Sequence, residues 1–275
     1  MEIIVNCPIC KHDAFNRITI NSKFGITSVV IKCNNCSLVF LEKQLDDDEV
    51  LKFYHDSYRV IKRERFDEIR YLGDLERAIS QFNFFKDFVK LDDEIIDIGA
   101  GWGINANYLF LKGYENIVVN ELDDKVEQQL DPRIVRKSEL IGSVGGKYDF
   151  IIMSHTLEHL FDLQGKVSSL FNMLNDGGKL FIEVPNSKNN KIVDGCSESY
   201  HYWYFMMTHL FLLADNNGFN VLKYGVFGKK QFICDMDSNV FSNWKRGISE
   251  DDLSSIVELP EYHENAYWLR VLFER

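Results

Sequence analysis

Four cysteines near the start of the 275-residue chain are spaced as metal ligands. They form two CxxC pairs, Cys7 with Cys10 and Cys33 with Cys36. Two such pairs can place four thiolates around one tetrahedral Zn²⁺, with no position left open for chemistry. The β-branched stretch between the pairs predicts a hairpin that returns the second pair to the first. We therefore predict a zinc ribbon with a structural ion, against the alternative of four unrelated thiols.

A glycine-rich turn follows an apolar strand in the middle of the chain. The strand at 95–98 contains Asp97, and Gly99, Gly101 and Gly103 come before an apolar helix. Strand, glycine turn and helix form the geometry of a cofactor-binding unit, because glycine allows positive φ and a close approach of ligand to backbone. The pattern is GxGxG rather than the GxGxxG of dinucleotide sites. A glycine motif alone is a weak signal, so residues elsewhere in the chain must indicate whether it binds a cofactor.

Polar residues follow the next three strands. Glu121 ends the second strand, at about the spacing expected for a carboxylate that binds ribose hydroxyls. Ser138 follows the third strand, where an adenine would lie, and Ser154 follows the fourth. Strands alternate with helices throughout this part of the chain, which predicts a parallel, doubly wound sheet. The expected fold is α/β, a Rossmann-like sheet with a small N-terminal zinc ribbon.

Two histidines stand in loops that such a sheet would place beside its ligand. His201 lies in an aromatic stretch after the fifth strand, and we predict it as a general base. The alternative is a hydrophobic lid with His201 packed inside it. His155, after the fourth strand, is the second catalytic candidate. His155 and His159 are four residues apart, but Thr156 stands where an HExxH zinc motif has its glutamate. We therefore expect no metal on this pair, and a structural role for His159.

These motifs resemble, in order and spacing, the class I S-adenosylmethionine-dependent methyltransferases. The matching blocks are residues 97–103, Glu121, residues 148–153 with 157–159, and residues 176–180. The resemblance implies that the three glycines hold the methionine and ribose parts of S-adenosylmethionine. It also implies that Asp97 lies near the methionine amine and that Glu121 binds the ribose. Ser138 stands where this family often has an acid that contacts the adenine.

A narrower resemblance includes the ribbon and is to the sugar methyltransferases of bacterial glycan pathways. In that group a histidine in an aromatic stretch at the place of His201 is functional. The chain ends before the C-terminal domain of the larger C-methyltransferases of the group, so we expect O-methylation of a sugar or nucleotide-linked sugar in surface-glycan biosynthesis. The alternatives are an RNA methyltransferase with a zinc module and a methyltransferase of another small metabolite.

Composition and charge separate these alternatives. We expect a ribbon at 1–45, a helical linker or lid at 46–90 and the methyltransferase domain at 91–275. The net charge of −11 resides in the last segment and argues against nucleic acid as partner. A basic cluster at Arg59, Lys62, Arg63 and Arg65 is either a solvated helix face or a clamp for a substrate phosphate. No apolar run is long enough to span a membrane and no signal peptide is evident, so we expect a cytoplasmic protein.

Overall fold

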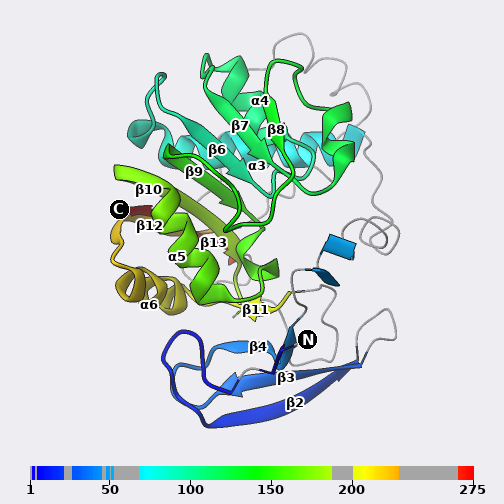
Figure 1. Cartoon of the computed structure of the whole chain (residues 1–275), viewed down its shortest axis with the longest axis vertical. Coiled ribbons are helices and arrows are strands. Elements are labelled where there is room, and N and C mark those ends of the chain that lie inside the picture. Colours follow the sequence, from blue (N-terminus) through cyan, green and yellow to red (C-terminus); the bar gives the residue numbers. More distant parts are fainter. Residues whose placement is uncertain are drawn as a thin grey trace.

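The computed structural model describes residues 2–3, 5–21, 27–44, 48–49, 51–52, 68–187, 201–228 and 266–275. A small β-rich unit, built from the start of the chain, lies at one end of a larger α/β unit (Figure 1). The basic cluster predicted between Arg59 and Arg65 lies outside the described residues, and so do residues 229–265. In the described part of the chain, no helix has the length and apolar character that a membrane span needs.

Seven strands form the central sheet in the order β12-β13-β10-β9-β6-β7-β8. They are β6 (Ile95–Ile98), β7 (Ile117–Asn120), β8 (Val135–Lys137), β9 (Tyr148–Ser154), β10 (Leu174–Pro185), β12 (Asn220–Gly228) and β13 (Ala266–Glu274). The strands from β8 to β10 run parallel, whereas β13 is antiparallel to both of its neighbours. The predicted parallel sheet is confirmed for the strands from β8 to β10.

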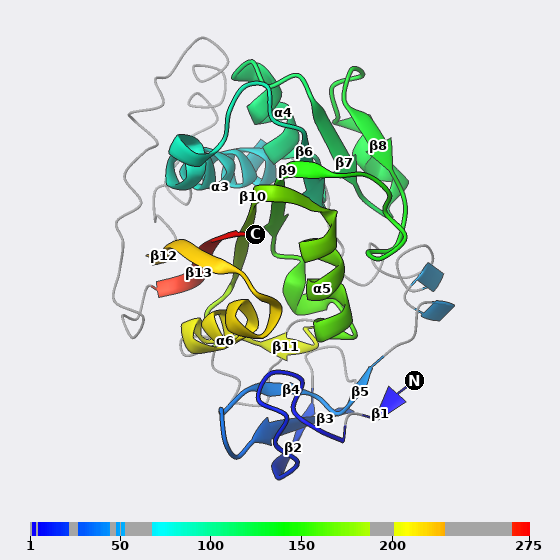
Figure 2. The ribbon, with the colours of Figure 1, turned by 60° about the vertical axis from the view of Figure 1, so that its left-hand side comes forward.

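Helices cover both faces of this sheet (Figures 1 and 2). They are α3 (Glu68–Phe85), α4 (Ile104–Leu111), α5 (Leu163–Met173) and α6 (Met207–Asn217), with short 3-10 turns η1 (Lys86–Phe88), η2 (Asp124–Gln128) and η3 (Leu157–His159). Side chains alternate along each strand, so Ile95 joins the core under α3 and α4 while Ile96 joins the core under α5 and α6. This is the predicted doubly wound α/β fold.

The ribbon is built on the predicted hairpin. Its strands β2 (Phe15–Asn21) and β3 (Thr27–Cys33) pair antiparallel, β4 (Val39–Leu41) pairs with β3, and β1 (Glu2–Ile3) pairs with β5 (Lys43–Gln44). The fourth strand of the ribbon sheet is β11 (Trp203–Tyr204), which comes from the loop after β10 and pairs with β4. The sequence did not predict this shared sheet.

In the second predicted segment, 46–90, helix α3 packs against the larger α/β unit. Helix α3 packs its aromatic residues on the central sheet, where Phe85 contacts the rings of Phe150 and Phe181 at centroid distances of 4.9 and 5.0 Å. The ribbon likewise shares a core with the α5 and α6 face, because buried Ile31 and Phe40 belong to the same apolar cluster as Leu210. Burial of these apolar side chains is what holds the three segments together.

Candidate active site and metal centre

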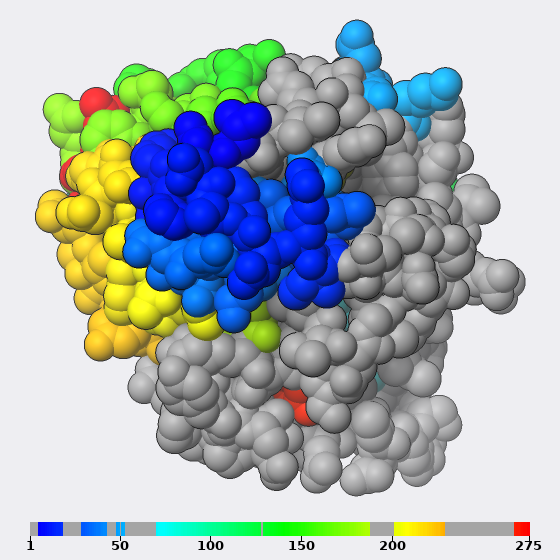
Figure 3. Space-filling model, turned by 90° about the horizontal axis from the view of Figure 1, so that it is seen from below, coloured from blue at the N-terminus to red at the C-terminus, as the bar shows by residue number. Residues whose placement is uncertain are grey.

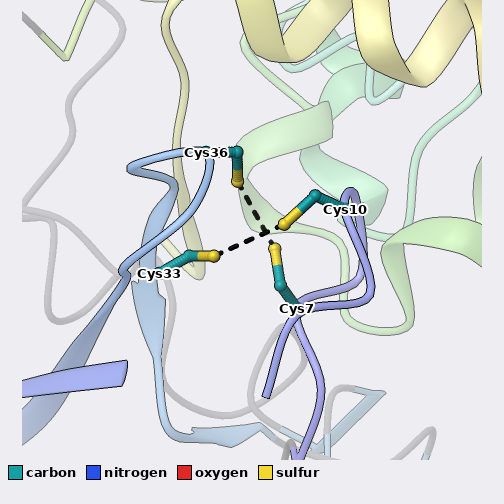
Figure 4. A group of neighbouring side chains, drawn as sticks. All are labelled: Cys7, Cys10, Cys33 and Cys36. Atoms are coloured by element: carbon teal, nitrogen blue, oxygen red, sulfur yellow. Dashed lines mark hydrogen bonds between the residues drawn. The ribbon is translucent and has the colours of Figure 1, made fainter. Parts of the chain in front are cut away.

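The four N-terminal cysteines converge at one point of the ribbon (Figure 4). Their sulfur atoms all lie within 4.8 Å of one another, with Cys7 Sγ 3.6 Å from Cys36 Sγ and Cys10 Sγ 3.4 Å from Cys33 Sγ. Thiolates about 2.3 Å from a tetrahedral ion stand about 3.8 Å apart, so the arrangement fits Zn²⁺. The contact with the Cys36 thiol lowers the pKa of Cys7 to about 5, while the same contact raises the pKa of Cys36.

A cavity of about 350 Å³ lies at the carboxyl ends of the parallel strands. Seven of the nine residues predicted for cofactor binding or catalysis line it, namely Asp97, Gly99, Gly101, Glu121, Ser154, His155 and His201. Ligands of open α/β sheets bind at this edge. The sequence thus predicted one site from residues that span more than a hundred positions of the chain.

The glycine turn forms part of the cavity lining. Gly99 has φ +70°, and a Cβ there would lie 2.3 Å from the Thr156 hydroxyl oxygen. Gly101 has φ +63°, and nothing lies within 4 Å of the position that a Cβ would take, because this residue faces the open cavity. Its N–H donates a hydrogen bond of 2.8 Å to Glu121 Oε2. Glycine is therefore required at 99 by a close neighbour and at 101 by the space left for a ligand.

Two buried carboxylates stand beside that turn. Asp97 is 1% exposed, and burial together with the nearby charge of Glu121 raises the pKa of Asp97 to about 7. Within the described residues, Asp97 Oδ2 has no hydrogen-bond partner. An orphaned buried carboxylate oxygen at the edge of a cavity suits a cationic ligand group. Glu121 accepts the N–H groups of Gly101 and Asp123 and still lines the cavity.

Two predicted cofactor residues do not line the cavity. Gly103 precedes α4 as its N-cap residue and has φ +72°, so it shapes the turn from outside the cavity. Ser138 is exposed and lies 3.3 Å from an Arg136 nitrogen. The residues that follow Ser138, from Glu139 to Ile141, line the cavity in its place. Ser138 follows the third strand, β8, as predicted, but it lies one position before the cavity wall, which begins at Glu139.

His155 is held between two buried carboxylates. Its Nδ1 lies 3.3 Å from Glu158 Oε1 and its Nε2 lies 3.1 Å from Glu183 Oε1. Burial lowers the pKa of His155, but the two carboxylates outweigh burial and the net shift is upward. His155 has φ +55°, a left-handed conformation that is uncommon outside glycine. It precedes η3, so it does not share a helix face with His159 as its spacing suggested.

His201 contacts η3, although it comes more than forty residues later in the chain. Its Nε2 lies 4.0 Å from Glu158 Oε1, and its ring centroid lies 4.7 Å from that of His159. The Tyr202 N–H donates to the Glu158 carbonyl at 2.8 Å, which fixes the chain next to His201 against η3. The indole N–H of Trp203 donates to the Leu160 carbonyl. The predicted catalytic histidine therefore stands on a braced segment at the cavity wall.

Sequence reasoning missed the ion pair that supports this wall. Glu183 of β10 and Arg270 of β13 stand opposite each other in register, both fully buried, and Arg270 Nε donates to Glu183 Oε2. Gln81 of α3 donates to Glu183 Oε1 and to the Ser154 hydroxyl, both at 2.7 Å. The available signal was one charged residue, opposite in sign, inside each of two apolar runs, at 180–184 and 267–273.

Comparison with known proteins agrees with this geometry. A family model described as a methyltransferase domain matches residues 62–224, and the chain belongs to that family. The magnesium protoporphyrin IX methyltransferase of Synechocystis PCC 6803 is similar with a TM-score of 0.56 and 14% identity, over 84% of this chain and 100% of that one. The 1,6-didemethyltoxoflavin-N1-methyltransferase of Burkholderia thailandensis has a TM-score of 0.53 and 12% identity, over 88% and 97%. Curated protein sequences give no match.

The protein is accordingly a class I S-adenosylmethionine-dependent methyltransferase. The predicted enzyme class and Rossmann-like fold are confirmed, and so is S-adenosylmethionine as the cofactor. The two similar structures are named for acceptors as different as a porphyrin and a toxoflavin precursor. The acceptor of this chain must therefore be argued from its own cavity, because one fold serves many acceptors.

Proposed function

We propose that the protein transfers a methyl group from S-adenosylmethionine to a hydroxyl of a sugar or nucleotide-linked sugar. The observation that carries the proposal is that the glycine turn and the histidines at 155, 159 and 201 line one cavity. S-adenosylmethionine supplies a methyl group on a sulfonium. The acceptor oxygen gains that group and loses its proton, and the electron pair of the broken carbon–sulfur bond stays on sulfur.

The residues proposed to hold the cofactor follow from their places in the cavity. The Asp97 carboxylate would face the methionine ammonium, the Gly101 backbone would pass close to the ligand, and Glu121 would accept the ribose hydroxyls. Ser154 also lines the cavity, next to His155 in the chain. Ser138 does not line the cavity. We propose that the residues after it, Glu139 to Ile141, contact the adenine, because they do line the cavity.

Asp97 gives this site an expected pH dependence. Because its folded pKa of about 7 lies above the ordinary value, Asp97 is neutral in acid and becomes a carboxylate as the pH rises. A methionine ammonium binds the carboxylate better, so affinity for S-adenosylmethionine should rise roughly tenfold from about pH 5.5 to pH 7. Calorimetry across this range checks it. An equally steep pH dependence in Asp97→Asn would assign the titration to another group.

Three cationic side chains, set among acidic and apolar residues of the cavity wall, support an acceptor that carries phosphate groups. Arg70 and Arg77 of α3 line it, each hydrogen-bonded to Asp74, and so does Lys166 of α5. Cationic side chains suit the phosphates of an activated sugar. A screen of activated sugars against tRNA and rRNA, with labelled cofactor, tests the class of acceptor. Transfer to RNA alone would replace the sugar proposal with the RNA methyltransferase alternative.

His201 is the side chain that we propose prepares the acceptor hydroxyl, and His155 is proposed to assist it. A neutral imidazole can take up the hydroxyl proton, as the sequence predicts. His201→Ala is expected to lower kcat by about 100-fold or more, while the Kd for S-adenosylmethionine changes by less than about threefold. Steady-state kinetics and calorimetry on one preparation measure both. Unchanged kcat would remove His201 from the reaction.

The ribbon is proposed to hold one structural Zn²⁺ through Cys7, Cys10, Cys33 and Cys36. The support is the convergence of four sulfurs in a geometry that leaves no open ligand position. Four reduced thiols also favour a reducing compartment, so we propose that the enzyme works in the cytoplasm.

A further inference from the structure

A second group of metal-ligating side chains lies in the cavity itself. Glu158 and His159 come from η3, and His201 comes from the segment before β11. Their ligand atoms all lie within 4.8 Å of one another. In the sequence, only His155 and His159 have a spacing that invites comparison with a zinc motif. The fold instead brings His201, more than forty residues away, to the carboxylate.

The carboxylate of Glu158 is the unusual member of this group. Its side chain is 1% exposed, and among the described residues neither of its oxygens accepts a hydrogen bond. Burying a carboxylate without hydrogen bonds costs several kcal/mol unless a cation compensates it. His155 Nδ1 lies 3.3 Å and His201 Nε2 lies 4.0 Å from Glu158 Oε1, and neither imidazole completes a hydrogen bond to it.

We propose that Glu158, His159 and His201 bind one divalent transition-metal cation in the acceptor part of the cavity. Two ligand atoms about 2.1 Å from one tetrahedral ion stand about 3.4 Å apart. The 4.0 Å between Glu158 and His201 therefore has to close by about 0.6 Å, and no pair, since all lie within 4.8 Å, has to close by more than about 1.4 Å. Two imidazoles and one carboxylate suit Mn²⁺, Fe²⁺, Co²⁺ or Zn²⁺ rather than Ca²⁺.

The backbone around the group is fixed before any ion arrives. The Glu158 carbonyl accepts the Tyr202 N–H, and the Leu160 carbonyl accepts the Trp203 indole N–H. These bonds tie the two residues after His201 to the chain on both sides of His159. His155, between Glu158 and Glu183, is placed to orient the Glu158 carboxylate rather than to bind the ion.

An ion held by three protein ligands keeps positions open toward the cavity. This inference rests on the proposed function, because the open positions would take the acceptor hydroxyl. The ion lowers the pKa of that hydroxyl, so its proton passes to solvent water as the oxygen–methyl bond forms. The carbon–sulfur bond breaks with its electron pair on sulfur. His201 then prepares the hydroxyl by holding the ion, in place of taking the proton itself.

Mn²⁺ is the probe for the test, because the thiolates of the zinc-loaded ribbon do not compete for it. We expect the full chain loaded with one equivalent of Zn²⁺, which the four ribbon thiolates take first, to bind about one Mn²⁺, measured from the loss of the electron paramagnetic resonance signal of free Mn²⁺. Glu158→Gln and His201→Gln should each weaken binding at least tenfold. Glu139→Gln, which removes a carboxylate from the lining of the same cavity, should leave it unchanged. Mn²⁺ that stays free, or that binds Glu158→Gln as well as the wild type, overturns the proposal.

A measurement on the wild type covers the case in which a variant fails to fold. In protein labelled with ¹⁵N-histidine, Mn²⁺ should broaden the imidazole signals of His159 and His201 and spare that of His12 in the ribbon. Broadening of His12 alone contradicts the site. Calorimetry with S-adenosylmethionine separates the two proposals. Cofactor binding and methyl transfer without Mn²⁺ binding defeat the cation site only, whereas no cofactor binding defeats the proposed function.

Discussion

Gly101→Asp is expected to abolish measurable binding of S-adenosylmethionine while the protein stays folded. Gly101 faces the open cavity, so the new side chain would occupy the ligand's space rather than clash with the protein. Its carboxylate would also stand beside Glu121, whose Oε2 lies 2.8 Å from the Gly101 nitrogen. Repulsion between the two would displace the carboxylate proposed to bind the ribose. We expect at least a 100-fold rise in Kd by calorimetry, about 2.7 kcal/mol.

Backbone strain must be separated from loss of the site, because residue 101 has φ +63°. A non-glycine residue in this region costs about 1–2 kcal/mol. Gly177→Asp is the matched control, since Gly177 has φ +73°, nothing within 4 Å of its added Cβ and no part in the cavity lining. Both variants should lose similar thermal stability, but only Gly101→Asp should lose the cofactor. Undiminished binding in Gly101→Asp would refute the assignment of the site.

The part of the site that sequence predicted is the part encoded by short-range patterns. Asp97 and the glycines sit within one strand and turn, and Glu121 ends the next strand, so periodicity and glycine spacing were enough to place them. Parallel strands bring their carboxyl ends to one edge, which is why His155 and Ser154 could be assigned to the same cavity from their order alone.

The part that sequence missed depends on side chains that meet across the fold. Glu183 and Arg270 are far apart in the chain and become partners only through the register of β10 with β13. His201 was assigned to the right cavity, but its neighbours Glu158 and His159 were judged by a local motif that omits it. The pairing of β11 with β4 is likewise a two-residue contact, too short to leave a periodic signal.

That pairing gives the ribbon a direct connection to the active site. The space-filling view from the ribbon side shows the first residues of the chain lying against the segment after residue 200 (Figure 3). Trp203 pairs with Phe40 in register, and their rings lie 5.5 Å apart. The Leu41 N–H donates to the Tyr202 carbonyl at 2.9 Å. His201 therefore immediately precedes residues that the ribbon holds in place.

A further contact joins the cysteine knuckle itself to the methyltransferase unit. His209 of α6 is fully buried, and its Nε2 lies 2.9 Å from the Cys36 carbonyl oxygen. On the other knuckle, Asn216 of α6 donates to the Ile9 carbonyl at 2.8 Å. Both knuckles are thus anchored to α6. If the proposed zinc orders the knuckles, it also orders the surface on which β11 and α6 rest.

Cys33→Ser is consequently expected to release the zinc and to lower kcat by about tenfold or more, with the Kd for S-adenosylmethionine changed by less than about threefold. The reason is that the glycine turn, Asp97 and Glu121 lie on the central sheet, whereas His201 depends on β11 and the ribbon. Metal analysis, calorimetry and steady-state kinetics on one preparation give the three values.

Arg17→Ala is the matched control for that variant, because it changes the ribbon without touching the cysteines. The Arg17 side chain is 73% exposed and pairs with Glu42 at the surface, where an ion pair contributes little. It should keep about one zinc per chain and full turnover. Zinc retained by Cys33→Ser would refute the four-cysteine site, and full turnover after zinc loss would show that β11 keeps His201 in place without the ribbon. Equal losses of turnover and cofactor affinity would instead mean that the two units unfold together, as their shared apolar core allows.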